Sequence, residues 1–251
     1  MSRANWFRSR AVPGLFALLL AGNALCHDEL IPHVAEYKVK ISVLGGTMRT
    51  QVFDVGDGYM ARSVITPTGF ASMFMDGSIV EQSEFVDDGN VLRPRHYESI
   101  DTLSKDKSTM TFDFDWPQQT VSGVIDDQDF VFPIDGLLHD RVSIQYQLMQ
   151  NLRNGKDAGQ YALLDGDELK RLTVTNIGTR RIKVPFGRFE AIGIQHQADD
   201  SSRVSTLWCV RELGYLPIVI EQHKDGKLRV QAVLTDYREL PAASEQTTAE
   251  N

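Results

Sequence analysis

Apolar and polar residues alternate with a period of two along much of the chain. The alternation is clearest at residues 37–43, 109–116 and 227–237. In the second of these segments, one face carries the apolar side chains of Met110, Phe112, Phe114 and Trp116. Such alternation is typical of antiparallel strands that pack one face on a core and expose the other to water.

Turn sequences separate these segments. Asp-Gly occurs six times, beginning at positions 57, 76, 88, 135, 165 and 225. A type I′ hairpin turn needs positive φ at both central residues, which Asp-Gly tolerates. The clearest predicted hairpin joins residues 216–224 to residues 227–237 through Asp225-Gly226. We predict a mainly β fold, a large antiparallel curved sheet, open barrel or sandwich of about a dozen strands.

One segment departs from the strand period. Residues 135–154 begin with Asp135, which can cap a helix, and Gly155 follows as a stop signal. Apolar residues recur between them at helical spacing, so we predict one main helix at about residues 135–154 that crosses the sheet. A short second helix is predicted within residues 67–75.

The first 26 residues have the parts of a secretory signal peptide. Three arginines precede an apolar run at residues 11–20, and small residues follow. A transmembrane anchor is the alternative, but about 20 apolar residues are needed to cross a bilayer and Pro13 interrupts this run. We predict a Sec-type signal peptide, cleaved after Ala24 or Cys26, and therefore a periplasmic protein.

The rest of the chain is predicted to be one β-rich domain, residues 27–240, followed by a disordered tail at residues 241–251. Lipidation at Cys26 is disfavoured because Leu25 stands where a lipoprotein signal has a small residue. Cleavage after Cys26 would leave Cys209 without a disulfide partner. No second apolar segment is long enough to cross a bilayer, so an integral membrane protein is not expected.

The net charge of the chain limits the classes of partner that are expected. The full sequence carries a formal charge of −8, and loss of residues 1–26 would change it to −11. An acidic protein is repelled by phosphate backbones, so a nucleic acid is not expected as a partner. Solubility is the simplest interpretation of the charge, and the oligomeric state is left open.

Candidate catalytic and metal-binding residues are sparse. The six histidines lack the spacing of a metal site, so neither metal nor cofactor is predicted. His139 and Asp140 are adjacent and cannot face each other on a helix, so a polar first turn is favoured over a catalytic pair. Acids at positions 126–129 suggest a hairpin loop more than a calcium site. Asp113 and Asp115 share a strand face about 7 Å apart, as in some glycosidases, although a wet sheet face is the usual meaning.

An apolar segment between Gly69 and Gly77 carries Phe70, Met73 and Phe74. Methionine and phenylalanine together make an adaptable apolar surface. One hypothesis makes these three residues a ligand-binding lid over an apolar cleft on the concave side of the sheet. The favoured alternative is a plug that completes the core.

The most distinctive segment is TLWCVRELGYLPI at residues 206–218. With VPFGRFEA at 184–191, PRHY at 94–97 and FDFDW at 112–116, it resembles a bacterial exported-protein family, domain of unknown function 3108. The likeness covers nearly the whole mature chain and implies a β-rich envelope protein. The family brings no agreed activity, so no catalytic residue is carried over.

The distinctive residues of this likeness are interpreted as structural. Trp208 is predicted to lie in a strand, and Leu213-Gly214-Tyr215 to form a turn. Pro217 can only begin a strand or lie on an edge. Gly187 is expected in a turn between two strands.

Three functions remain open. The first is a non-enzymatic envelope factor that binds an apolar ligand, a lipid or acyl chain, in a curved sheet similar to that of lipoprotein-carrier half-barrels. The second is a structural or interaction module that docks on an envelope protein. The third is a carboxylate-dependent envelope hydrolase. The absence of a catalytic motif favours a role other than catalysis.

Expression of the full chain in a Gram-negative host tests the signal peptide. We expect the protein in the periplasmic fraction, with an intact mass that lacks residues 1–24 or 1–26. An uncleaved chain in the cytoplasm would contradict the prediction.

Overall fold

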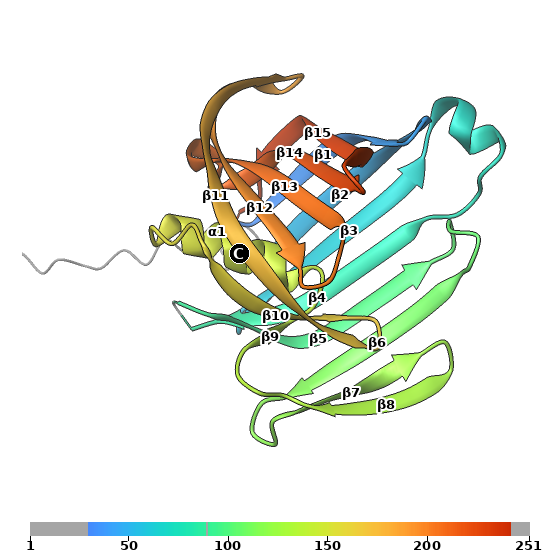
Figure 1. Cartoon of the computed structure of the whole chain (residues 1–251), viewed down its shortest axis with the longest axis vertical. Helices are drawn as coiled ribbons and strands as arrows, with labels where there is room; N and C mark the ends of the chain where they lie inside the picture. The colour runs from blue at the N-terminus through green and yellow to red at the C-terminus, as the bar shows by residue number, and fades with distance from the viewer. Residues whose placement is uncertain (1–29, 89, 242–251) are drawn as a thin grey trace, which may run out of the picture.

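The computed structural model describes residues 30–88 and 90–241, where fifteen strands form one sheet (Figure 1). The predicted signal peptide, and all of the predicted tail except its first residue, lie outside the described residues. The strands are β1 His33–Ile41, β2 Leu44–Asp54, β3 Tyr59–Pro67, β4 Ile79–Asp87, β5 Leu92–Asp101, β6 Ser108–Asp115, β7 Thr120–Ile125, β8 Gln128–Pro133, β9 Leu138–His139, β10 Gly159–Asp165, β11 Glu168–Val184, β12 Gly187–Ala198, β13 Arg203–Val210, β14 Leu216–Lys224 and β15 Lys227–Glu239. The helices are η1 Gly69–Met73, α1 Ser143–Arg153 and η2 Arg211–Leu213.

The sheet is a meander with two arms. One arm runs outward from β1 to β8, and the other runs from β15 back to β9. The arms are joined at the centre, where β1 and β15 pair antiparallel. Only the short β9–β10 pairing is parallel among the described strands. The predicted large antiparallel sheet is confirmed.

The sheet has more strands than the predicted dozen. Some of the fifteen strands are short. Strands β7 and β8 have six residues each, and β9 has two. Strands this short give a weak periodic signal.

The two arms curl toward each other, and α1 lies in the concave space between them (Figure 1). Strand β9, near the end of one arm, contacts β5 in the other. Helix α1 contacts both β4 and β5. The edge strands β8 and β9 are not paired with each other, so the described sheet is curled but not closed.

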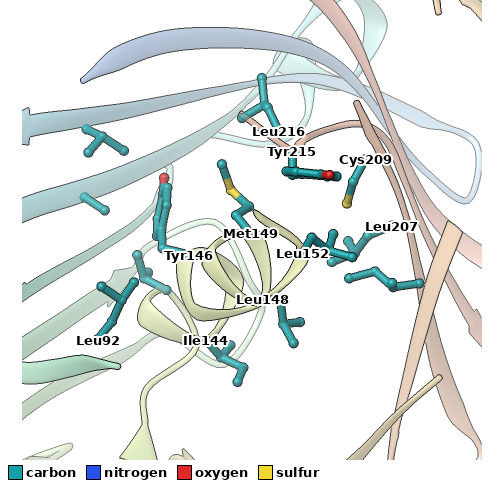
Figure 2. Packing of buried hydrophobic residues seen from close by; sticks show 14 of the residues in the cluster. Leu92, Ile144, Tyr146, Leu148, Met149, Leu152, Leu207, Cys209, Tyr215 and Leu216 are labelled. Carbon is teal, nitrogen blue, oxygen red and sulfur yellow. The ribbon is translucent and has the colours of Figure 1, made fainter. Parts of the chain in front are cut away.

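The core forms between α1 and the concave face. Nine of the eleven residues of α1 are buried, and Figure 2 shows side chains radiating from the helix toward the surrounding strands. Phe85 of β4 stacks on Tyr146 of α1, with ring centroids 5.6 Å apart. Burying an aromatic side chain of this size contributes about 2–3 kcal/mol. The helix is therefore a core element enclosed by the sheet.

The alternation that predicted the strands is confirmed in β6. Phe112 and Phe114 are buried on its inner face, and Asp113 is exposed on the other. The pattern fails at the end of β1. Ile41 is partly exposed and Val43, beyond the strand, is 89% exposed, because the hairpin there extends past the core.

Two predicted turns are also confirmed. Asp225 and Gly226 have φ angles of 53° and 71° and join β14 to β15, as a type I′ turn requires. Pro185-Phe186 joins β11 to β12, directly before Gly187.

The predicted helix boundaries were wrong at the start. Helix α1 begins at Ser143, not near residue 135, because Gly136 has a φ of 81° and Leu138–His139 pair with β10 as β9. Backbone in the left-handed region, followed by a strand pairing, cannot form the first helical turn.

Asp140, not Asp135, caps the helix. One carboxylate oxygen of Asp140 accepts hydrogen bonds of 2.8 Å from the backbone N–H groups of Val142 and Ser143. The other oxygen accepts a 2.7 Å hydrogen bond from the hydroxyl of Ser83 in β4. Desolvation is the largest effect on this buried group and raises the pKa of Asp140 despite these hydrogen bonds.

The expectation that His139 lies in a polar turn was wrong. His139 is 0% exposed, and neither ring nitrogen has a hydrogen-bond partner among the described residues. It lies in β9, in the interior between the arms.

Trp208 and its neighbours have a structural role. Trp208 lies in β13, is buried, and faces Gly193 of β12, where an added Cβ would come within 2.7 Å of the indole ring. The guanidinium of Arg180 lies 3.7 Å from the ring centroid. Gly214 and Tyr215 both have positive φ in the predicted turn.

Pro217 is the second residue of β14 and lies opposite the bulge at Trp208/Cys209. The sequence predicted the first residue of a strand or an edge strand; Pro217 instead lies one residue inside an interior strand, where it pairs with β13 only, before the pairing with β15 begins. Cys209 is buried, and burial raises the pKa of its thiol. Within residues 30–88 and 90–241, no helix combines the length and apolar character that a membrane span requires.

Substitution of Asp140 tests the role of the cap. Asp140→Ala removes the acceptor for buried N–H and hydroxyl groups, so we expect a loss of about 3 kcal/mol in the free energy of unfolding. Asp140→Asn keeps an acceptor oxygen and removes a buried charge, so a loss below about 1 kcal/mol is expected. Urea denaturation at pH 7.5 measures both, and equal effects would contradict this account of the cap.

Candidate functional site

A cavity of about 490 Å³ lies between α1 and the inner faces of β10–β14. Small-molecule sites typically have volumes of about 300–1,000 Å³. The chain just before α1 and the helix itself line one side, through Arg141, Ile144, Gln145 and Leu148. The strands and the β12–β13 turn line the other, through Leu163, Asp165, Lys170, Leu172, His196, Ala198, Ser201, Ser202, Arg203, Ser205, Leu207, Ile220, Gln222 and Lys224.

Apolar side chains form the inner part of this lining. Leu148 of α1 is 3% exposed, and Leu172 and Leu207 are buried on the facing strands. Leu207 lies opposite Ile220 in the β13–β14 register. Apolar ligand surface placed here would be removed from water, which contributes about 25 cal/mol per Å².

The lining becomes polar and then cationic along β13 and β14. The cross-strand partners that face the cavity are, in order, Leu207 with Ile220, Ser205 with Gln222, and Arg203 with Lys224. Alternate residues of a strand point to the same face, which is why these three pairs line one wall. The cavity is therefore apolar at its inner end and positively charged at its mouth.

His196 lies on the same wall, paired with Ser205 in the β12–β13 register. Desolvation lowers its pKa to about 4. The ring is therefore neutral at pH 7 and offers one donor and one acceptor to the cavity.

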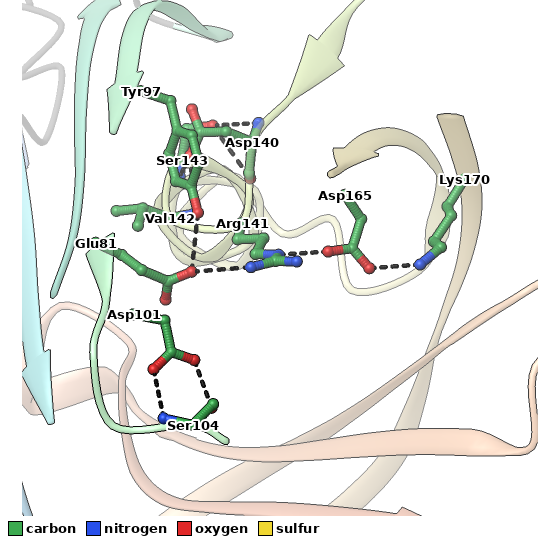
Figure 3. Close-up of polar contacts among 10 residues, drawn as sticks. All are labelled: Glu81, Tyr97, Asp101, Ser104, Asp140, Arg141, Val142, Ser143, Asp165 and Lys170. Carbon is green, nitrogen blue, oxygen red and sulfur yellow. Dashed lines mark hydrogen bonds and ion pairs between the residues drawn. The ribbon is translucent and has the colours of Figure 1, made fainter. Parts of the chain in front are cut away.

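A charged network lies on the side of the cavity formed by β10, β11 and the chain before α1, and it ties α1 to both arms of the sheet (Figure 3). The guanidinium of Arg141 pairs with Asp165 of β10 and lies 3.5 Å from the carboxylate of Glu81 in β4. Glu81 accepts a 2.9 Å hydrogen bond from the hydroxyl of Tyr97 in β5. Lys170 Nζ lies 2.5 Å from Asp165.

The same network keeps the carboxyl group of Asp165 ionised. Burial on its own would raise the pKa of Asp165, but hydrogen bonds and charge from Lys170 and Arg141 outweigh it and lower the pKa. Asp165 is thus ionised at neutral pH and already paired with two cations. It is the only carboxylate among the residues that line the cavity.

Phe70, Met73 and Phe74 do not line this cavity. They lie in and directly after η1, which packs on β2 at an end of the sheet away from α1 (Figure 1). Their side chains are 72–74% exposed, so the plug interpretation was wrong. The hairpin loop holds η1 outside the core, where only Ala71 of this segment is buried. A binding role for the three residues stays a prediction.

The carboxylates singled out in the sequence lie in the arm formed by β1 to β8. Asp113 accepts a hydrogen bond from His96 Nδ1, with 2.7 Å between the two atoms, on the solvent-exposed face and outside the cavity. Asp126 and Asp127 both have positive φ in the β7–β8 hairpin, which confirms the turn. Among the residues described, no group of three or more His, Cys, Asp or Glu is placed to hold a metal ion.

The sequence did not identify the residues that do line the cavity. Their alternation was visible, since Arg203, Ser205 and Leu207 are spaced by two. Alternation alone gives two faces and does not tell which one meets a helix. The face that meets the helix is set by contacts between segments that are distant in sequence, such as Arg141 with Glu81.

The fold defines the class of the protein as a curled, barrel-like antiparallel β protein with an internal helix. The chain belongs to the family described as "Protein of unknown function (DUF3108)", whose model matches residues 34–233. The expected family membership is thus confirmed. No curated protein matches the chain.

Solved structures support the fold. The chain is similar to a crystal structure of a beta-barrel-like protein, domain of unknown function DUF1849, from Brucella abortus, with a TM-score of 0.58 and 12% identity over 85% of this chain and 99% of that one. At this identity the likeness shows the fold alone.

Two other structures match with lower TM-scores. One is described as a lipoprotein from Parabacteroides distasonis, with a TM-score of 0.34 and 12% identity over 83% of this chain and 96% of that one. The other is described as an exported protein with a YmcC-like fold from Bacteroides fragilis, with a TM-score of 0.33 and 10% identity over 84% of this chain and 97% of that one. These scores are too low to bear on the fold.

The buried histidines predict a loss of stability in acid. Burial lowers the pKa of His139 to about 3, below the ordinary 6.5. As the pH falls below 6.5, the unfolded chain binds a proton at this residue that the folded chain does not. Stability is therefore lost between about pH 6.5 and 3, by about 1.4 kcal/mol per pH unit for each such histidine.

His139→Leu tests this origin of the acid sensitivity. Between pH 7.5 and pH 5.0, the variant should lose about 2 kcal/mol less unfolding free energy than the wild type does, measured by urea denaturation. The measurement at pH 7.5 is the control for packing. An unchanged pH dependence would show that His139 is not the buried neutral group described here.

Proposed function

We propose that this protein is a non-enzymatic cell-envelope factor that binds an apolar ligand, a lipid or acyl chain, inside its curled sheet. The observation that carries the proposal is the cavity of about 490 Å³ between α1 and β10–β14, with Leu148, Leu172 and Leu207 among its lining residues. Ligand sites of this kind are concave, mostly apolar, and fixed by a few polar groups.

The packing around the cavity supports a preformed site. Helix α1 is held by the Asp140 cap and by the ion pairs of Arg141 with Asp165 and Glu81. A wall anchored at both arms of the sheet keeps its shape without ligand. A preformed site loses less entropy when it binds.

The proposed location is the periplasm. It rests on the basic, apolar and small-residue segments within residues 1–26. An apolar cargo would fit such a location, since the periplasm is an aqueous space between two membranes.

Matched tryptophan substitutions test the binding site. Ser205 faces the cavity, and its neighbour Val204 points to the opposite face of β13. Ser205→Trp should fill the cavity and weaken binding of an apolar fluorophore, or of 1-dodecanol in competition with it, by about tenfold or more. Val204→Trp is the control and should bind like the wild type.

Thermal unfolding of both variants checks that they are folded. Saturable binding to the wild type that Ser205→Trp weakens supports the proposal. Failure of the wild type to bind, or equal binding by both folded variants, would reject this cavity as the site.

A second candidate function rests on the exposed side chains of Phe70, Met73 and Phe74. Exposed apolar clusters mark contact sites more often than isolated apolar residues do. This segment would then dock the protein on an envelope protein. Phe70→Ser with Phe74→Ser should abolish co-purification of such a partner and leave fluorophore binding in the cavity unchanged.

A further inference from the structure

We propose that the ligand of this cavity is a single-chain amphiphile with an anionic head, of the fatty-acid type, whose head group is bound by Arg203 and Lys224. This inference rests on the proposed function and specifies its ligand. It comes from the arrangement of charge at the mouth of the cavity.

Arg203 and Lys224 are direct cross-strand partners in the β13–β14 register, and both line the cavity. Like charges directly opposite each other destabilise a sheet. Within the described part of the chain, neither side chain takes part in an ion pair. An anion between them would turn this repulsion into two attractive contacts.

The other two cations of the cavity are already engaged. Arg141 is paired with Asp165 and Glu81, and Lys170 with Asp165 and Glu168. The charges of Arg141 and Lys170 are therefore already balanced by carboxylates. Among the described residues that line the cavity, Arg203 and Lys224 are the cations that remain available to bind an anion.

Three acids in the turns next to the mouth do not line the cavity. Asp199 and Asp200, in the β12–β13 turn, line an adjoining groove with Glu168 and do not line the cavity. Asp225, in the hairpin after Lys224, is also absent from the lining. The wall that faces the cavity between β13 and β14 thus ends in two positive charges.

The order of residues along this wall fixes the orientation of the ligand. From the inner end to the mouth, the pairs are apolar at Leu207, neutral and polar at Ser205, and cationic at Arg203. An acyl chain would lie against the inner layer with its head group at the mouth. The planar guanidinium of Arg203 suits a carboxylate, which it can bind through two parallel hydrogen bonds.

Binding of dodecanoate and of 1-dodecanol to delipidated protein separates the two proposals. Both probes carry the same chain, and only the first is charged at pH 8. We expect dodecanoate to bind about tenfold more tightly at low salt, by displacement of an apolar fluorophore. Raising the salt concentration should reduce this preference.

The double variant Arg203→Gln/Lys224→Gln should lose the preference for dodecanoate and still bind 1-dodecanol like the wild type. Arg181→Gln is the control, because Arg181 is exposed on β11 and outside the cavity. It should keep the preference.

Each of the other outcomes would reject a specific part of the proposal. Equal affinity of the wild type for the two probes would reject the anionic head group and leave the apolar site standing. A preference that survives in the double variant would reject Arg203 and Lys224 as its source. Failure of both probes to bind would reject the proposed function and this inference together.

Discussion

The two arms of the sheet are brought together by helix α1 and by one ionic bridge between segments that are distant in sequence. Among the described residues, the two arms of the sheet pair strand to strand only at their centre, where β1 meets β15. Away from this centre, α1 packs between the two arms. The guanidinium of Arg141 contacts Glu81 in one arm and Asp165 in the other. Loss of Arg141 would leave Glu81 without its ion pair, while Asp165 would keep its contact with Lys170.

The cavity follows from this arrangement. An antiparallel sheet that curls without closing leaves a concave apolar face, which must be covered. Helix α1 has eleven residues and covers the part of this face near β4 and β5, with Phe85 against Tyr146. The part formed by β10–β14 remains open beside the helix, and the binding site proposed here is that remainder.

The features that could be predicted from the sequence are those set by neighbouring residues, such as turns and the faces of strands. The β14–β15 hairpin followed from Asp225-Gly226, and the face of Phe112 followed from alternation. The start of α1 did not follow, because both Asp135 and Asp140 can cap a helix. Asp140 caps the helix because the left-handed backbone at Gly136 and the pairing of β9 with β10 exclude a helical turn after Asp135.

The candidate site was harder to predict because it also depends on contacts between segments that are distant in sequence. A segment rich in phenylalanine and methionine looks alike whether it lies in a core, on a lid or in water, and η1 proved to be exposed. The cationic pair of Arg203 and Lys224 arises from the register of two strands, which single residues do not reveal. Sequence alternation gives the faces of each strand, and only the assembled sheet gives their neighbours.

We propose that the space beside α1 holds an apolar chain, and native mass spectrometry of protein purified from its native cells without detergent is the decisive measurement. We expect a bound species of a few hundred daltons that is lost on unfolding and identified as an anionic amphiphile. A homogeneous mass equal to the chain alone, with no uptake of added dodecanoate, would contradict it.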